Sequence, residues 1–128
     1  MAEVMAERDP RRRLVEAALS YPGAIEDFPW GERVAKVNKK IFAFFGADDA
    51  TTSGMTVKLP SSCDFALCFA SATPSGYGLG KAGWVRLDFG HRECPDIDLL
   101  SDWLDESYRA VAPQRLIAEL DASADSRR

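Results

Sequence analysis

Apolar residues follow helical spacing near both ends of the chain. A first stripe, from Leu14 to Leu19, comes after Asp9, a good N-cap, and Pro10, a favourable first helical residue, and it ends at Pro22-Gly23. A second stripe follows Asp96 or Asp98 and comprises Leu99, Leu100, Trp103, Leu104, Tyr108 and Val111. Pro113 then separates it from a short amphipathic helix that contains Leu116, Ile117 and Leu120.

Between these helices the apolar residues lie in short runs rich in β-branched and aromatic side chains, which is typical of strands. Turn-like stretches separate the runs, which cover residues 25–28, 33–37, 40–45, 55–59 and 84–89. Ser61 or Ser62 can cap a short helix that extends to Phe69. The order of helix, strands, helix, strand and helices predicts an α+β domain with an antiparallel sheet.

Strict alternation along these strands would divide the side chains between two faces of the sheet. One face, packed against the helices, would hold Met55, Val57, Leu59, Val85, Leu87 and Phe89. The other face would hold Thr56 and would collect four cations and three aromatic rings. These are Lys36, Lys40, Lys58 and Arg86, with Phe42, Phe44 and Trp84. Such a face suits a nucleic-acid strand, because phosphates meet the cations and bases stack on the rings.

The composition fits one domain over residues 1–128, ordered from about residue 9 to about residue 120, with both ends frayed. A net charge of −4 argues mildly against a dedicated DNA-binding protein. The three cysteines form no C-x-x-C pair, so we expect reduced thiols. We find neither the apolar core of a signal peptide nor an apolar run of ~20 residues, so we expect a cytoplasmic protein that does not engage membranes.

Four clusters of residues could in principle bind a metal ion or a phosphate or catalyse a reaction, but each lacks a residue or a geometry that such a site needs. His91 and Cys94 supply too few ligands for zinc and lack a third orienting group for nucleophilic catalysis. The glycine-rich segment 76–81 departs from a phosphate-binding loop at Ser75 and Ala82, and a mobile lid over a groove is its remaining functional interpretation.

The other two clusters are carboxylates. Glu26 and Asp27 are neighbours on a predicted strand and would point to opposite faces, and Asp48-Asp49 lies in a separate loop. We therefore expect no catalytic residue, no cofactor and no metal, and hence no enzyme.

Several segments together resemble the MmcQ/YjbR family of small bacterial proteins. The most specific are the motif from Pro22 to Gly31, the run from Lys36 to Ala43, Lys58-Leu59, Trp84-Val85 and Ser107-Tyr108. The resemblance implies a CyaY-like α+β fold, a two-layer arrangement with an antiparallel sheet and helices packed on one face. Members are often described as DNA-binding by analogy of fold, and the family supplies no agreed catalytic residues.

Three functions therefore stay open. We favour a non-enzymatic protein that binds DNA or another polyanion through Lys36, Lys40, Phe42, Lys58, Trp84 and Arg86. The alternatives are a module that binds another protein or a second copy of itself, and a protein that holds a small ligand under the 76–83 loop.

Overall fold

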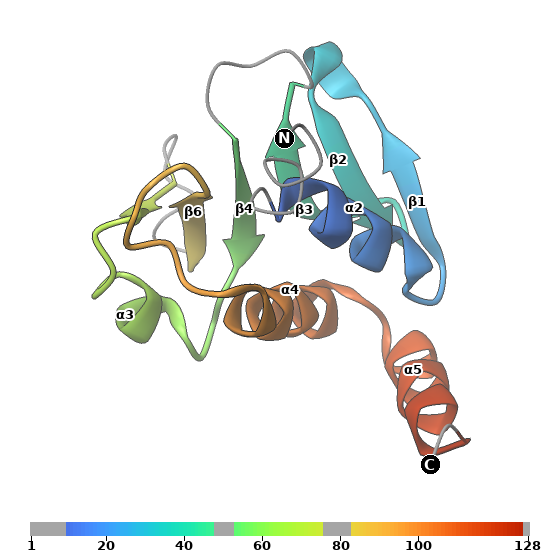
Figure 1. Cartoon of the computed structure of the whole chain (residues 1–128). Coiled ribbons are helices and arrows are strands. Elements are labelled where there is room, and N and C mark those ends of the chain that lie inside the picture. The colour runs from blue at the N-terminus through green and yellow to red at the C-terminus, as the bar shows by residue number, and fades with distance from the viewer. Residues whose placement is uncertain (1–9, 48–52, 76–82, 127–128) are drawn as a thin grey trace, which may run out of the picture.

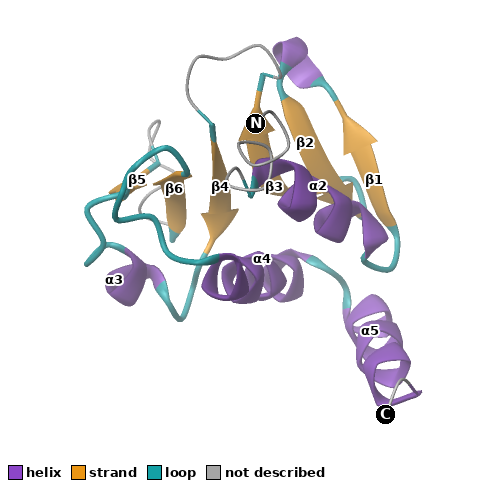
Figure 2. Cartoon of the chain, in the orientation of Figure 1, coloured by secondary structure: helices purple, strands orange, loops and turns teal. Residues whose placement is uncertain are grey.

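A six-stranded antiparallel sheet organises the computed structural model, which describes residues 10–47, 53–75 and 83–126. Its strand order is β1-β2-β3-β4-β6-β5 (Figures 1 and 2). The strands are β1 (Ala24–Asp27), β2 (Arg33–Val37), β3 (Lys40–Gly46), β4 (Gly54–Lys58), β5 (Ala72–Pro74) and β6 (Trp84–Asp88).

The helices among the described residues are α2 (Arg11–Ser20), the 3-10 turn η1 (Pro29–Gly31), α3 (Cys63–Ala66), α4 (Ile97–Val111) and α5 (Gln114–Ser126). In Figure 1, α2 crosses in front of the strands, α4 runs along the lower part of the sheet, and α5 extends away from the body. Both α2 and α4 contribute to one core cluster with the sheet. The predicted α+β arrangement is therefore confirmed.

Helix α4 begins where the sequence placed a cap. The Asp96 carboxylate accepts a hydrogen bond from the Leu99 N–H at 3.1 Å, which satisfies one of the free donors of the first turn. Its apolar stripe faces the sheet, and the buried side chains are Leu100, Trp103, Leu104, Ser107 and Tyr108. Against it lies the predicted core face, whose six residues are all buried: Met55, Val57, Leu59, Val85, Leu87 and Phe89.

The turn between α2 and β1 depends on a glycine. The Ala24 N–H donates to the Tyr21 carbonyl at 3.1 Å, and Gly23 has a φ of +72°, which side chains with a Cβ rarely adopt. Pro10 occupies the N-cap position of α2, while the predicted cap Asp9 lies outside the described residues. The chain thus turns sharply from the helix layer into the edge of the sheet.

Three elements differ from the sequence prediction. Helix α3 ends at Ala66, whereas the predicted helix extends to Phe69. Residues 72–74 form the edge strand β5, which was predicted as loop because it has only three residues and ends in Pro74. Helix α5 continues to Ser126, although its apolar positions end at Leu120 and the stretch beyond was predicted to be frayed.

Strand β3 contains a β-bulge against β2. Ala35 pairs with Ala43, but the next residue, Lys36, pairs with Ile41. Phe42 is therefore an extra residue that interrupts the ladder. Its ring turns into the core and has 0% of its surface exposed.

The same strand has a second bulge near its end. Val34 pairs with Phe44, whereas Arg33 pairs with Gly46, so Phe45 is also extra. Phe45 is 2% exposed and belongs to the same core cluster. Two irregularities thus place two additional aromatic rings in the core and end the alternation of faces along β3.

No helix in the described part of the chain is long and apolar enough to cross a membrane.

Candidate nucleic-acid interface

Cross-strand pairs define what we call the open face, the side of the sheet opposite α2 and α4. Paired residues of antiparallel strands lie on one face, so a single row can be followed across the sheet. That row runs through Asp27, Val34, Phe44, Thr56, Arg86 and Thr73. Thr56 and Val34 are 9% and 1% exposed, so neighbouring side chains cover the middle of this face.

Four residues of the open face form a basic-aromatic patch: Phe44, Lys58, Trp84 and Arg86. The rings of Phe44 and Trp84 meet edge to face, with centroids 5.5 Å apart and an interplanar angle of 72°. Lys58 pairs directly with Trp84 across β4 and β6. All four side chains are half-buried, so the patch presents rings and charged ends while the stems of its cations pack on the sheet.

Arg86 lies across Gly54 on the neighbouring strand. A Cβ placed on Gly54 would be 3.3 Å from the Arg86 Nη2 atom and would collide with the carbonyl oxygen of Leu87. Glycine at this position therefore lets the guanidinium group lie flat against β4.

Lys36 lies on the open face, but its charge is neutralised. Its Nζ atom is 2.6 Å from an Asp27 carboxylate oxygen. Hydrogen bonds from Lys36 and from the Phe28 N–H hold the pKa of Asp27 below its usual value. Lys36 therefore adds less positive potential to this face than the sequence suggested.

The structure corrects the sequence prediction for Lys40 and Phe42. Phe42 is buried, and its ring makes edge-to-face contacts with Tyr108 at 5.3 Å and with Tyr21 at 6.1 Å. Lys40 pairs with the core residue Val37, so it starts from the helix-covered side and is exposed at the end of the hairpin. Because the bulge at Phe42 inverts the alternation, neither residue joins the basic-aromatic patch.

Ser107 connects α4 with the patch through the sheet. Its buried hydroxyl donates to the Phe42 carbonyl at 2.5 Å and accepts the Lys58 N–H at 2.8 Å. These two backbone groups lie just beyond the last pair of the ladder between β3 and β4, and the hydroxyl satisfies both. Sequence reasoning noted Ser107 only within the family-like pair Ser107-Tyr108, and its position on the buried side of α4 was the available signal.

The two neighbouring carboxylates lie on opposite faces, as predicted. Glu26 pairs with Arg33, and the Arg33 guanidinium also stacks over the Phe28 ring at 4.8 Å from its centroid. Asp27 instead meets Lys36 on the open face. Two separate ion pairs are the result, which does not favour joint acid-base chemistry.

Glu106 has a structural role that the sequence pattern did not reveal. The apolar stripe of α4 predicts a Glu106 that faces solvent. Its carboxylate instead accepts hydrogen bonds from the Ser61 and Ser62 N–H groups, both at 3.0 Å, and from the Ser62 hydroxyl at 2.6 Å. Ser62 is the N-cap residue of α3 but makes no cap bond with its own side chain. Glu106 thus supplies the acceptor from another helix.

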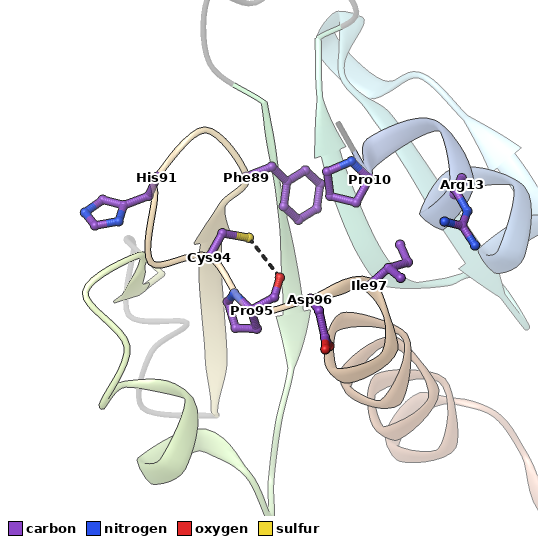
Figure 3. A pocket seen from close by; sticks show the side chains of 8 residues that line it. All are labelled: Pro10, Arg13, Phe89, His91, Cys94, Pro95, Asp96 and Ile97. Carbon is purple, nitrogen blue, oxygen red and sulfur yellow. Dashed lines mark hydrogen bonds between the residues drawn. The ribbon is translucent and has the colours of Figure 1, made fainter. Parts of the chain in front are cut away.

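A separate hollow of 340 Å³ lies between the starts of α2 and α4 (Figure 3), lined by Pro10, Arg13, Phe89, His91, Cys94, Pro95, Asp96 and Ile97. In Figure 3 the His91 ring points away from the Cys94 sulfur. His91 Nδ1 accepts the Glu93 N–H at 3.0 Å, and the Cys94 thiol donates to the Pro95 carbonyl at 3.5 Å.

Burial, and then the charge of Asp88, raise the pKa of the Cys94 thiol. A thiol with a raised pKa is a poor nucleophile at neutral pH, so this geometry does not form a nucleophile-base pair. Within residues 10–47, 53–75 and 83–126, no group of three or more His, Cys, Asp or Glu side chains could hold a metal ion.

Two features weighed from the sequence, the glycine-rich loop at 76–82 and the acidic pair Asp48-Asp49, lie outside the described residues. The potential lid and the second carboxylate cluster therefore stay predictions.

A search of the curated proteins finds no match to this chain. The sequence profile of the YjbR family matches residues 19–110, which extend from the last turn of α2 to the last turn of α4 and include the whole sheet and Ser107. The matched region covers well over half of the chain, and the chain therefore belongs to the YjbR family.

Proposed function

We propose that this protein binds single-stranded nucleic acid, without catalysing a reaction, through the basic-aromatic patch. The observation that carries the proposal is the edge-to-face contact of the Phe44 and Trp84 rings beside Lys58 and Arg86. When a flat ring lies next to a cation, a base can stack on the ring while its phosphate contacts the cation. Unpaired bases can reach such a ring, whereas the bases of a duplex are stacked on each other.

The size of the patch limits the strength of binding. Stacking contributes roughly 1–3 kcal/mol per base, and Lys58 would neutralise about one phosphate. For a single strand, one such contact corresponds to a log–log salt slope of about −0.7. Affinity should therefore fall by about 2.6-fold between ~50 mM and ~200 mM salt, a weak dependence consistent with a protein whose net charge is −4.

The test is a fluorescence-anisotropy titration of labelled single- and double-stranded oligonucleotides at these two salt concentrations. Trp84→Ala should weaken single-strand binding by roughly fivefold to 150-fold, which corresponds to one lost stacking contact. Lys58→Ala should weaken binding to every sequence and reduce the salt slope by about 0.7.

Lys40→Ala is the matched control for Lys58→Ala. It removes the same charge from an exposed lysine that starts on the other side of the sheet. We expect Lys40→Ala to leave both the affinity and the salt slope unchanged. No binding at ~50 mM salt, or equal losses in Lys40→Ala and Lys58→Ala, would contradict the proposal, provided that circular dichroism shows folded variants.

A further inference from the structure

The two edges of the sheet differ in how well they are protected. Within the described residues, β1 and β5 are the outermost strands, so each has a strand neighbour on one side only. Strand β5 has three residues and ends in Pro74, which has no N–H to donate to another strand. Strand β1 contains no proline. Apart from the Ala24 N–H, which donates to the Tyr21 carbonyl, the backbone groups along its outer side can pair with a further strand.

An apolar side chain stands at this unprotected edge. Ile25, in β1, is 57% exposed, and Phe28 directly after the strand is 48% exposed. A single exposed isoleucine on a surface needs no explanation, but one on an unpaired strand edge adds apolar burial to any pairing of the backbone.

The acids of β1 do not protect this edge as charged side chains usually do. Glu26 is paired with Arg33, and Asp27 is paired with Lys36 at 2.6 Å. Both partners lie on β2, so the ion pairs are complete within one copy of the chain. The remaining repulsion between two β1 edges is therefore small.

Symmetry limits how two such edges can pair. In an antiparallel pair, opposite residues share a face, whereas neighbours along one strand point to opposite faces. A symmetric pair therefore cannot set a residue opposite its neighbour's copy, and the two-fold axis must pass beside a residue that is opposite its own copy. An axis at Glu26 sets two carboxylates against each other, and an axis at Ala24 or Asp27 brings Pro22 or Pro29 into the ladder. An axis at Ile25 avoids both problems and buries the exposed side chain against itself.

We infer that a second copy of this chain pairs with β1 across its free edge, with the two Ile25 residues opposite each other. Ala24 then faces Glu26 of the second copy, and Asp27 faces Gly23, so no like charges are opposed. The six-stranded sheet continues from one copy into the other. Because the paired strand has only four residues, the interface is small, and the dimer should be weak, with a Kd on the order of 10 µM to 1 mM.

This association is independent of the proposed nucleic-acid binding. The basic-aromatic patch belongs to β3, β4 and β6, and β2 separates these strands from the paired edge. A twist of about 20–25° per strand further turns the two patches away from each other. Loss of dimerisation should therefore leave oligonucleotide affinity unchanged, and loss of oligonucleotide binding should leave the dimer intact.

The register is tested by disulfide formation in two variants, each carrying Cys68→Ser to remove the exposed native thiol. Ile25→Cys places two thiols opposite each other at the axis, at a distance that a disulfide can bridge. Glu26→Cys shifts the thiol by one residue and to the other face. Under mild oxidation we expect Ile25→Cys to form a 25–25 crosslinked dimer at least about tenfold faster than Glu26→Cys, mapped by mass spectrometry. Equal or reversed rates would overturn the proposed register.

The dimer itself is tested by sedimentation equilibrium from about 10 µM to about 1 mM. The unmodified chain should gain mass with concentration, and Ile25→Lys should stay monomeric. Phe65→Lys is the matched control, because Phe65 is exposed to the same extent, 56%, on α3. A chain that is monomeric throughout, or a dimer that survives Ile25→Lys or is lost in Phe65→Lys, would overturn the inference.

Discussion

The hydroxyl of Ser107 replaces a strand partner inside the sheet. Beyond the Ala43–Val57 pair, where the ladder between β3 and β4 ends, this one atom bridges the Phe42 carbonyl and the Lys58 N–H. A buried backbone group without a partner costs about 1–3 kcal/mol, so the serine stabilises both the bulge and the start of the basic-aromatic patch.

Ser107→Ala should therefore destabilise the protein by about 2–6 kcal/mol, because two backbone groups lose their partner at about 1–3 kcal/mol each. Urea unfolding followed by circular dichroism measures this loss. Ser101→Ala is the control, since Ser101 is half-buried on the same helix and its replacement should change stability by less than about 0.5 kcal/mol. Equal effects of the two substitutions would contradict the role of Ser107.

The residues of the candidate site could be predicted only in part. Alternation places Lys58, Trp84 and Arg86 correctly because β4 and β6 pair without irregularity over five residues. It fails for Phe42 because a bulge adds a residue without any proline, glycine or charge to mark it. The neutralisation of Lys36 also escapes the sequence, since it depends on the pairing of β1 with β2.

At the scale of elements, α5 is held to the body by few contacts. Leu116 is 7% exposed and packs close to Gly23, where a Cβ would lie only 2.8 Å from its Cδ1 atom. Arg109 adds an ion pair to Asp121 at 2.8 Å. This pair anchors the helix at the first residue beyond Leu120, and apolar periodicity in the sequence does not reveal such a charged contact.

Gly23→Ala should loosen α5 as well as strain the turn. Alanine at a φ of +72° costs about 1 kcal/mol, and its Cβ would displace Leu116. Gly31→Ala is the matched control, because Gly31 has a φ of +81° and no atom within 4 Å of an added Cβ. Both variants should lose stability in urea, but only Gly23→Ala should speed trypsin cleavage after the exposed Arg115. Equal cleavage would show that Gly23 does not control the docking of α5.

The elements themselves were largely predictable, because the amphipathic stripe of α4 and the β-branched runs of β2, β3 and β4 are strong local signals. Strand β5 was not, since three residues carry no readable period and only the pairing with β6 defines them. Local sequence patterns thus predict the elements, whereas the edges of the sheet depend on tertiary contacts between residues far apart in the sequence.

At the scale of the whole molecule, a cluster of three rings joins α2, α4 and the sheet. Tyr21 stacks on Tyr108 at 4.6 Å, and both meet the edge of Phe42. Their hydroxyls donate to the Asp105 carboxylate at 3.1 Å and to the Pro22 carbonyl at 2.6 Å. Burial, and then the nearby carboxylate, raise the pKa of both phenols, with Asp105 acting on Tyr21 and Glu119 on Tyr108.

Stability should consequently fall at alkaline pH. Both phenols have a pKa above the ordinary 10.0 in the folded state, so their contribution is complete below pH 10.0 and is lost as the pH rises above it. The unfolded chain then releases protons that the folded chain retains. Urea unfolding above pH 10.0 should show a free energy of unfolding that falls with pH, and this fall should be smaller in Tyr21→Phe and in Tyr108→Phe than in the unmodified chain. An unchanged fall in both variants would contradict this assignment.

The two bulges of β3 also determine where a probe or a new functional group can be attached. Ile41 and Phe44 reach the open face although they are three residues apart, a spacing that belongs to a helix rather than to a strand. A label intended for that face should replace one of these two residues, and the same label at position 42 or 45 would enter the core. Removing a single residue from this strand would exchange the two faces for every residue between the deletion and the hairpin.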